Sequence, residues 1–441
     1  MRAWTWYALV AIVLFSAWVQ WTAVRETRFY NLGGPDAGSY LSYAYNLREF
    51  ATYSRSHTWT ETRPSPPIPD AVSPPGYPLF LAAFLRGGPD YAFHQRVISA
   101  QAGLGVLTTL LAFLLALRVA GPGVACAVGI LVAMTPHLVT ISTYLLTESL
   151  FTCLLLAATL ALVIALQQRN RVLPWALAGL MFGASCLVRP TLQLLVPLSL
   201  LVVIAVPRYR PWLKQVAIAV ACACVVLLPW FTYKASLRAN PDQPDLLRAT
   251  LYHGSFPDFM YDGDRGTKGF AYRFDPQAAE VMSSYAGLGH VVGQRMAADP
   301  LRYLRWYFFG KPKAFLSWDN ASPGAGDAFI EPVVDSPFFH RTSFRLMHAF
   351  MYGWHWPLML LGIAAALAAL RRPGLLGAGV DPPSLRLVSA LAITAIALHM
   401  IGAPYPRYGI PFWPLFYLLA ATGLAWAFRA LRDRLKKPGI D

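Results

Sequence analysis

Apolar residues dominate the chain in long runs that short polar segments interrupt. About ten of these runs approach the roughly 20 residues that a helix needs to cross a hydrocarbon core. The runs lie near residues 6–24, 97–117, 121–140, 144–166, 173–188, 191–206, 213–231, 347–370, 386–402 and 408–428. This pattern predicts an all-α polytopic membrane protein with about ten transmembrane helices.

Two long polar segments separate the apolar runs. They divide the chain into a first transmembrane helix (1–24), a first loop (25–96), a transmembrane bundle (97–231), a second large loop (232–346) and a C-terminal part with helices and a basic tail (347–441). The residues Gln20-Trp21-Thr22 are too bulky and polar for a signal-peptide cleavage site, so we expect the first run to remain as an anchor.

Basic residues mark alternate ends of the apolar runs. One set of ends carries Arg2, Arg118, Arg169, Arg171, Arg208, Arg210, Lys214, Arg371, Arg372, Arg386, Arg429, Arg432, Arg434, Lys436 and Lys437. The opposite short loops carry only Arg189 and Arg407. Because cationic loops stay on the cytoplasmic side, both termini are predicted inside and both large loops outside. The net charge of +15 then reflects topology and contact with anionic membrane lipids rather than nucleic-acid binding.

The first outer loop begins with an aspartate ahead of an amphipathic segment. Five residues share one face at helical spacing: Tyr40, Tyr43, Ala44, Leu47 and Phe50. We expect this helix to lie in the membrane interface, with its tyrosines at headgroup depth. Asp36 precedes it and has two interpretations: an N-cap completed by Ser39, or a carboxylate that acts on a substrate at the membrane surface.

A proline-rich run from Pro64 to Pro78 follows this segment. Its restricted φ angles and missing backbone donors predict a stiff, extended loop rather than a helix or a strand. Tyr77 and Phe80 are expected to pack down onto the bundle before a second short helix near 79–86. Composition alone favours a plain spacer here.

The second outer loop contains more than irregular chain. Asp262 and Asp264 resemble part of a calcium loop, but the other ligand positions are missing, so a turn is the favoured interpretation. A helix is predicted over 277–296. The stretch 301–309 combines aromatic and basic residues, which is typical of an interfacial helix.

Three ionisable residues lie at outer ends of predicted spans, where a charge is costly and is therefore a functional candidate. They are Glu148, Arg189 and Arg407. The alternative is a structural ion pair of Glu148 with one of the arginines, or arginines that reach to the headgroups.

Histidines and cysteines add little to this set. His57, His94 and His253 are alternative candidates for a base in the outer loops, and His137 and His399 are expected to be packed or hydrogen-bonded at outer span ends. All five cysteines lie in predicted spans, and no cysteine or carboxylate spacing indicates a metal site or a cofactor.

The order of several short motifs resembles the GT-C superfamily of polyprenyl-phosphate-sugar-dependent glycosyltransferases. The motifs are Asp36 after the first span, Pro74-Pro75-Gly76-Tyr77-Pro78, Thr147-Glu148-Ser149, Arg189-Pro190 and Arg407-Tyr408. The likeness is greatest to the bacterial glycosyltransferase family 39 group, relatives of protein mannosyltransferases and aminoarabinose transferases. It covers the membrane bundle and the first loop.

The resemblance implies a GT-C-type bundle whose outward cavity takes a lipid-linked sugar, with Asp36 in the position of the catalytic carboxylate. Many members carry a second acidic residue directly after it, where this chain has Ala37. Glu148 is the candidate for a second carboxylate.

Transfer from a polyprenyl phosphate needs a base for the acceptor hydroxyl and cationic donors for the leaving phosphate. We assign the base to Asp36, with inversion expected at the sugar, and the phosphate to Arg407 first and Arg189 second. Tyr408, Tyr40 and Tyr77 are the expected aromatic neighbours. The sequence leaves the sugar and the acceptor, whether glycan, lipid or protein, unspecified.

The expected location is the bacterial inner membrane, with the site facing the periplasm. Two other functions use the same features: a transporter or flippase for a lipid-linked or amphiphilic solute, and a non-catalytic assembly partner built on this fold. The chain shows no internal repeat and no ionisable residue at the middle of a predicted span, which argues against the transporter.

Overall fold

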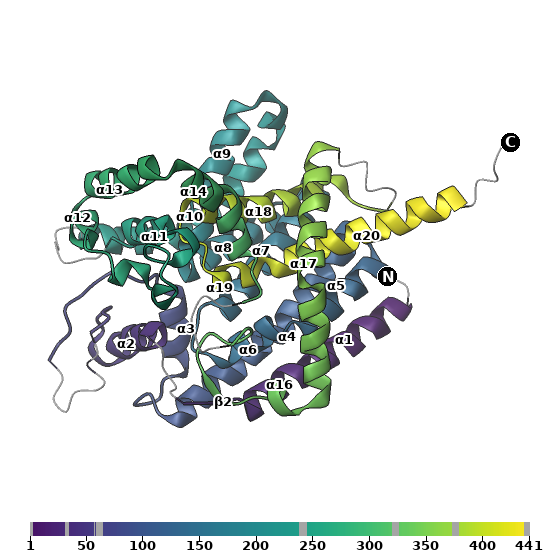
Figure 1. Cartoon of the computed structure of the whole chain (residues 1–441). Helices are drawn as coiled ribbons and strands as arrows, with labels where there is room; N and C mark the ends of the chain where they lie inside the picture. Colours follow the sequence, from purple (N-terminus) through teal and green to yellow (C-terminus); the bar gives the residue numbers. More distant parts are fainter. Residues whose placement is uncertain are drawn as a thin grey trace.

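The computed structural model describes residues 3–30, 35–56, 58, 65–237, 245–319, 326–372 and 379–435. Its long apolar helices form one bundle around a continuous core (Figure 1). The long helices are α1 (Ala3–Glu26), α4 (Tyr91–Ala120), α7 (Glu148–Gln167), α8 (Val172–Val188), α10 (Leu213–Ser236), α17 (Thr342–Arg371), α18 (Pro382–Ile401) and α20 (Trp413–Leu435). The predicted all-α membrane fold is confirmed.

The number of spans is slightly lower than the sequence predicts. Within the described residues, seven helices are long and apolar enough to cross a membrane, or nine if each of two bent pairs counts as one span. The first pair is α5 (Pro122–Met134) with α6 (Pro136–Thr140) and the 3-10 turn that follows, bent by 57°. The second joins α8 to α9 (Leu195–Ala205) through a bend of 120° at Arg189-Pro190. Proline disfavours helical geometry in the residue before it, which explains why both helices break there.

The predicted sixth span is therefore only a half-length helix. At about 1.5 Å per residue, the 11 residues of α9 reach about half of a 30 Å hydrocarbon core. Gly179 and Gly183 of α8 lie directly against Ala219 and Ala223 of α10, so these two helices run in the same direction. α9 must then carry the chain back between them, and the alternation of ends expected from the basic residues is preserved.

In the first outer segment, the chain that follows α2 folds back over a tyrosine of that helix. α2 (Pro35–Phe50) is the predicted amphipathic helix, and Asp36 is its second residue, inside the first turn rather than at the cap. Tyr43 is fully buried and stacks on Tyr53 with 4.2 Å between ring centroids. The tyrosine face therefore packs mainly on protein, because the chain after α2 folds back to cover Tyr43. Its depth relative to the headgroups stays a prediction.

Residues 65–75 of the proline-rich run form neither helix nor strand, as predicted, but residues 76–78 at its end are helical, which the prediction missed. The short helix α3 (Gly76–Phe84) starts three residues earlier than expected. Tyr77 is fully buried and Phe80 packs on the core, which confirms that both residues face the bundle. Gly33, Gly34, Pro64 and the candidate base His57 lie outside the described residues.

The second outer segment has a small core of its own, formed by Tyr252, Phe256, Ala271, Val281, Leu288 and Val291. The predicted helix over 277–296 is two helices, α12 (Ala278–Ser283) and α13 (Tyr285–Ala298), because Ser284 is extended and its side chain caps α13. Asp262 and Gly263 both have positive φ, which confirms the predicted turn. In Figure 1 these helices lie at the left with α2, opposite the first residues of α1 and the end of α20.

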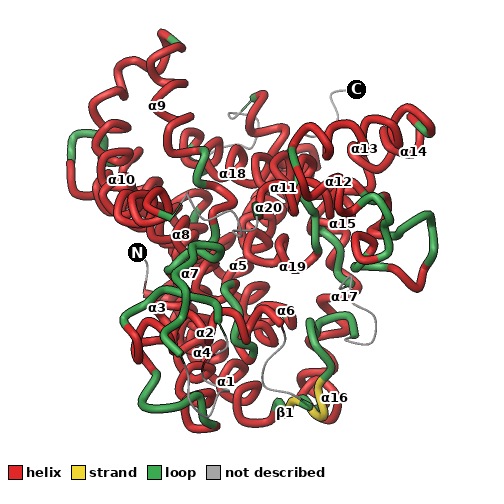
Figure 2. Tube along the Cα trace, turned by 90° about the vertical axis from the view of Figure 1, so that its left-hand side faces the viewer, coloured by secondary structure: helices red, strands yellow, loops and turns green. Residues whose placement is uncertain are grey.

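The remaining part of this segment returns to the bundle. α14 (Pro300–Arg305) continues through one π-helical turn, Trp306–Gly310, into α15 (Lys311–Phe315). A two-stranded antiparallel sheet then pairs β1 (Arg28–Phe29) with β2 (Val333–Asp335), seen at the lower edge of Figure 2 beside α16 (Pro337–His340). The end of the second outer segment is thereby tied to the end of α1.

Candidate active site

Asp36 and Arg407 meet at the outer-loop end of the bundle. Asp36 lies in the first turn of α2, and Arg407 lies in α19 (Pro406–Gly409), the short helix before α20. An Arg407 Nη2 hydrogen bond to Asp36 Oδ2 joins them. The positive charge of Arg407 holds the pKa of the Asp36 carboxyl below its ordinary value, although burial acts in the opposite direction. Asp36 is therefore a carboxylate at neutral pH.

A second ion pair lies directly beside the first. Glu148 is the first residue of α7 and its side chain is only 2% exposed; Arg189 ends α8 and donates to it. Arg189 also donates to the Thr147 hydroxyl at 3.3 Å. Arg407 Nε lies 3.6 Å from Glu148 Oε1, so Arg407 bridges the two carboxylates. The four predicted ionisable residues thus form one chain of alternating charge, Asp36, Arg407, Glu148 and Arg189.

Aromatic rings surround this charged chain. The guanidinium carbon of Arg189 lies 4.5 Å from the centre of the Tyr408 ring, and that of Arg407 lies 5.5 Å from it. Burial raises the pKa of Tyr40, and the charges of Asp36 and Glu148 raise it further, so its hydroxyl stays protonated beside them. Tyr40 and Tyr408 therefore line the charged cluster.

Tyr77 lies behind Tyr40, as seen from the four charged residues. Its ring meets Tyr40 edge to face at 5.3 Å, and its hydroxyl donates to Gln101 at 2.7 Å. Gln101 in turn donates to the backbone carbonyls of Ser142 and Tyr144. Tyr77 and Gln101 thus connect the wall behind Tyr40 to the segment that leads into α7.

The sequence reasoning missed one carboxylate. Glu331 lies in the second outer segment, and its backbone carbonyl accepts a hydrogen bond from the Tyr144 hydroxyl at 2.9 Å. Burial raises the pKa of the Glu331 carboxyl; Asp36 raises it further and Arg407 opposes this. Glu331 is therefore close enough to the cluster to sense its charges. No periodic pattern surrounds Glu331, and only its place between Phe329-Ile330 and Pro332 marked it in the sequence.

The histidines occupy other positions. His253 stacks on Tyr272 at 3.8 Å, and His94 meets the ring of Phe29 edge to face. His137 Nε2 hydrogen-bonds the carbonyl of Trp318 at 2.7 Å, and His399 bonds the carbonyl of Ala395, as expected for packed histidines. Among the described residues, no group of three or more histidine, cysteine or acidic side chains is arranged to hold a metal ion.

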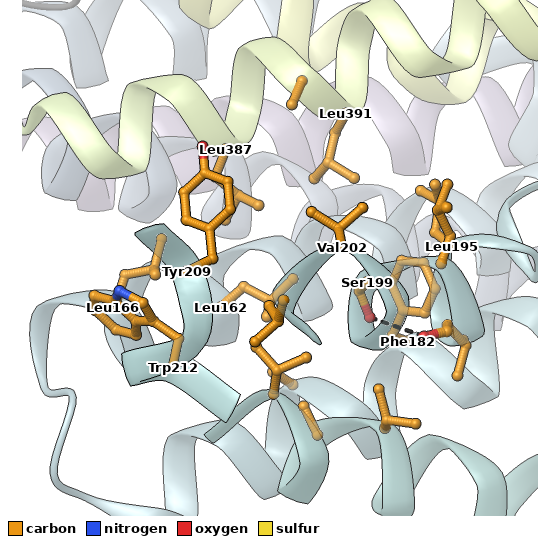
Figure 3. A pocket seen from close by; sticks show the side chains of 18 of the residues that line it. Leu162, Leu166, Phe182, Leu195, Ser199, Val202, Tyr209, Trp212, Leu387 and Leu391 are labelled. Carbon is orange, nitrogen blue, oxygen red and sulfur yellow. Dashed lines mark hydrogen bonds between the residues drawn. The ribbon is translucent and has the colours of Figure 1, made fainter. Parts of the chain in front are cut away.

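An apolar cavity of about 810 Å³ extends along the bundle from Phe182, seven residues before Arg189, toward the end that the basic residues predict to be cytoplasmic. Figure 3 shows Phe182 and Leu195 at one end, Tyr209 and Trp212 at the other, and Leu387 and Leu391 of α18 across from them. α8, α9, α10 and α18 supply most of the wall. Arg208 and Arg386 lie at the far end, on the side that the basic residues predict to be cytoplasmic. The cavity has the shape and polarity to hold a hydrocarbon chain.

Comparison with known proteins adds a family match over part of the chain. The model of the dolichyl-phosphate-mannose-protein mannosyltransferase family matches residues 72–233, which include α3, α7, α8 and most of α10. Glu148 and Arg189 lie inside this region, whereas Asp36 and Arg407 lie outside it. Among curated proteins, none matches the sequence significantly.

Solved structures match the whole fold. The archaeal oligosaccharyltransferase AglB from Archaeoglobus fulgidus, in complex with an inhibitory peptide and a dolichol-phosphate, is 15% identical with a TM-score of 0.51; the match covers 99% of this chain and 52% of that chain. The same enzyme tethered to an acceptor peptide gives 16% and 0.55, covering 99% and 51%. ArnT from Cupriavidus metallidurans bound to undecaprenyl phosphate is a weaker structural match: 18% identity and a TM-score of 0.42, covering 98% and 79%.

This chain thus spans about half the length of the AglB structures that it matches. The similarity extends over nearly all of this chain, from the first helix to the last. The protein is therefore an integral membrane protein with a GT-C-type helical fold, the fold class that its sequence predicted.

Proposed function

We propose that this protein is a membrane glycosyltransferase that moves a sugar from a polyprenyl-phosphate donor to an acceptor hydroxyl. The observation that carries the proposal is the ion pair between Asp36 and Arg407, because a carboxylate and a guanidinium are the two groups that such a transfer needs. The match to the mannosyltransferase family and the fold shared with AglB support it. One AglB structure contains a dolichol-phosphate, which is a polyprenyl phosphate.

In this proposal the donor phosphate takes the place of Asp36 on Arg407. Arginine donates in a fork that suits phosphate oxygens, and its side chain here is 23% exposed, so a ligand can reach it. Arg189 remains with Glu148 and adds a second positive charge nearby. Once the phosphate neutralises Arg407, the pKa of Asp36 rises, because the cation that lowered it is occupied. Binding of the donor thereby makes Asp36 a stronger base.

The chemical step then needs few groups. The acceptor oxygen forms a bond to the anomeric carbon while the bond between that carbon and the phosphate oxygen breaks. The electron pair leaves with the polyprenyl phosphate, which Arg407 stabilises, and the acceptor proton passes to Asp36. Attack from the face opposite the leaving group inverts the anomeric centre. We assign Glu331 and Tyr40 to the sugar, and Tyr77 to the support of Tyr40.

The apolar cavity is our candidate for the polyprenyl chain of the donor. Its wall is almost entirely aliphatic and aromatic, and the α8 residue of the wall nearest to Arg189 in the chain is Phe182, seven residues before it. A lipid phosphate held at Arg407 and Arg189 would leave its hydrocarbon chain free to descend between α8, α9 and α18. This arrangement accounts for the half-length helix α9, which leaves room beside it.

We further propose that the site faces the periplasm of a bacterial inner membrane, with residues 25–96 and 232–346 as the outer segments. The arginines at the opposite ends of the helices support this orientation. The acceptor, whether glycan, lipid or protein, would approach over the small core of the second outer segment. A transporter is not favoured, because the paired charges of Asp36, Arg407, Glu148 and Arg189 lie at an end of the bundle rather than at its centre.

The direct test uses purified protein in lipid nanodiscs and a panel of polyprenyl-phosphate sugars. We expect release of free polyprenyl phosphate from one donor, faster than in matched nanodiscs without protein. Bound donor that is never cleaved, with every acceptor class supplied, would contradict the proposal. Movement of intact donor between leaflets in the same samples would indicate a flippase.

A further inference from the structure

The short loop that carries Arg407 is held at both ends by one helix of the second outer segment. The loop runs from Gly402, after α18, to Gly409, before α20. At its first end, Lys311 Nζ of α15 donates to the carbonyls of Ile401 at 3.2 Å and Gly402 at 2.9 Å. At its second end, Gly409 is so close to the Phe315 carbonyl of the same helix that a side chain there would overlap it.

Lys311 is an unusual residue to find at this place. Its side chain is fully buried, and within the described part of the chain no carboxylate lies within ion-pair distance of it. Its Nζ lies 3.7 Å from the centre of the Tyr307 ring. The π-helical turn at Trp306–Gly310 directly precedes Lys311, and such turns often mark functional positions in helices.

The two carbonyls that Lys311 binds lie at the end of α18: Ile401 is its last residue and Gly402 follows it. A helix has no N–H of its own for its last carbonyls, and within the described part of the chain no other backbone N–H donates to these two. α11 (Leu246–Ser255) packs closely on Gly402, because a Cβ on Gly254 would be 2.2 Å from the Gly402 oxygen. Leaving a partly buried acceptor unpaired costs free energy. Lys311 therefore supplies the donors for two partly buried carbonyls at the end of α18.

Burial lowers the pKa of Lys311 to about 7. The amine keeps at least two N–H groups in either protonation state, one for each carbonyl, so both contacts survive deprotonation.

Other contacts of the second outer segment reinforce the same loop. Tyr405 stacks on Phe259 with 4.6 Å between ring centroids and an angle of 10°, and its hydroxyl donates to the Gly269 carbonyl at 3.3 Å. Two residues further on, Arg407 reaches Asp36 and Glu148. A shift of Gly402 would therefore move the guanidinium of Arg407.

We propose that Lys311 is a positioning residue: through the Ile401 and Gly402 carbonyls it fixes the loop that sets Arg407 against the donor phosphate. The second outer segment would then do more than meet the acceptor, because it would also hold the phosphate-binding arginine in place. This inference rests on the role proposed above for Arg407.

The test compares Lys311→Met, which keeps the length of the side chain and removes its donors, with Lys313→Met, an exposed lysine on the same helix. The probe is undecaprenyl phosphate, with its dissociation constant measured in nanodiscs on folded, monodisperse protein. We expect about tenfold weaker binding for Lys311→Met, no change for Lys313→Met, and partial recovery for Lys311→Arg. A merely structural lysine would lower the yield and the melting temperature but leave the affinity of the folded fraction unchanged, which would overturn the proposal.

Two further measurements separate this inference from the proposed function. Hydrogen exchange over residues 401–409 should be faster in Lys311→Met, whatever ligand the protein binds, and unchanged exchange would overturn the proposal. In an Arg407→Ala background, Lys311→Met should cause no additional loss of affinity, because coupled residues are not additive. If Arg407→Ala alone leaves the affinity unchanged, the assignment of the phosphate to Arg407 fails, and the exchange measurement still tests Lys311. Should Lys311→Met not fold, Tyr307→Leu disturbs the same amine and is tested in the same way.

Discussion

Arg407 and Asp36 are 371 residues apart in the chain and form an ion pair in the fold. Transfer from a lipid phosphate requires a cation for the leaving group and a base for the acceptor. In the proposed mechanism Arg407 is the cation and Asp36 is the base. Glu148 and Arg189 stand beside them as a second pair, with Arg407 in contact with both carboxylates. The balanced charges leave no free phosphate site until a ligand displaces one carboxylate.

Replacing Arg407 by alanine should weaken donor binding more than it destabilises the protein. Hydrogen bonds to charged groups are worth about 1.5–3 kcal/mol, so we expect a loss of roughly 10- to 100-fold in affinity for the donor. The measurement is titration with a polyprenyl phosphate. Arg55→Ala, an exposed arginine of the first outer segment, is the matched control. An affinity equal to wild type would place the phosphate elsewhere.

The pH dependence should differ between free and donor-bound enzyme. Arg407 lowers the pKa of Asp36 below its ordinary value of 3.8, so the acid limb of kcat/KM should lie below pH 3.8. A donor phosphate on Arg407 removes that effect and raises the pKa of Asp36, so the acid limb of kcat should lie at higher pH. Rates of donor cleavage across acidic pH test this. Coincident limbs would mean that the phosphate does not compete with Asp36 for Arg407.

Glu148 should be essential to stability because it is the buried partner of Arg189. Glu148→Gln leaves that guanidinium without its carboxylate, and breaking a buried pair costs about 3–5 kcal/mol. We therefore expect a clearly lower thermal unfolding temperature. The double variant Glu148→Gln with Arg189→Leu should recover most of it, because the uncompensated cation is gone. If the single variant is as stable as wild type but inactive, Glu148 is catalytic rather than structural.

Filling the apolar cavity should affect long-chain donors selectively. Val202 lines the cavity, whereas the adjacent Leu201 does not line it and is 60% exposed. Val202→Trp should raise KM severalfold for a donor with a full-length polyprenyl chain and leave a short-chain analogue unaffected, whereas Leu201→Trp should change neither. Equal effects on both donors would show that the hydrocarbon chain lies outside this cavity.

Much of this arrangement could be predicted from the sequence. Apolar runs and basic ends predicted the bundle, and the cost of charge near the membrane singled out Glu148, Arg189 and Arg407, which the fold brings together with Asp36. The half-length α9 was missed, because its composition is as apolar as that of a full span and only Pro190 marked the break. The burial of Tyr43 was missed because it depends on how the following loop folds back.

Contacts between residues far apart in the sequence could not be predicted from the pattern of apolar and polar residues. Glu331 and Lys311 are single charged residues in an outer segment without a clear period, and a lysine in such a place is normally solvated. Only the fold shows that Lys311 is buried against the end of α18 and that Glu331 lies close enough to Asp36 and Arg407 to sense their charges.

The central claim, that Asp36 is the base of a polyprenyl-phosphate sugar transferase, is tested most directly by Asp36→Asn. The substitution keeps the size of the side chain and removes its basicity. We predict that donor affinity is retained or increased, because Arg407 loses its competing anion, while donor cleavage falls by about 10²- to 10⁴-fold. Glu49→Gln, an exposed acid at the far end of α2, should behave like wild type. Cleavage by Asp36→Asn at close to the wild-type rate would contradict the account.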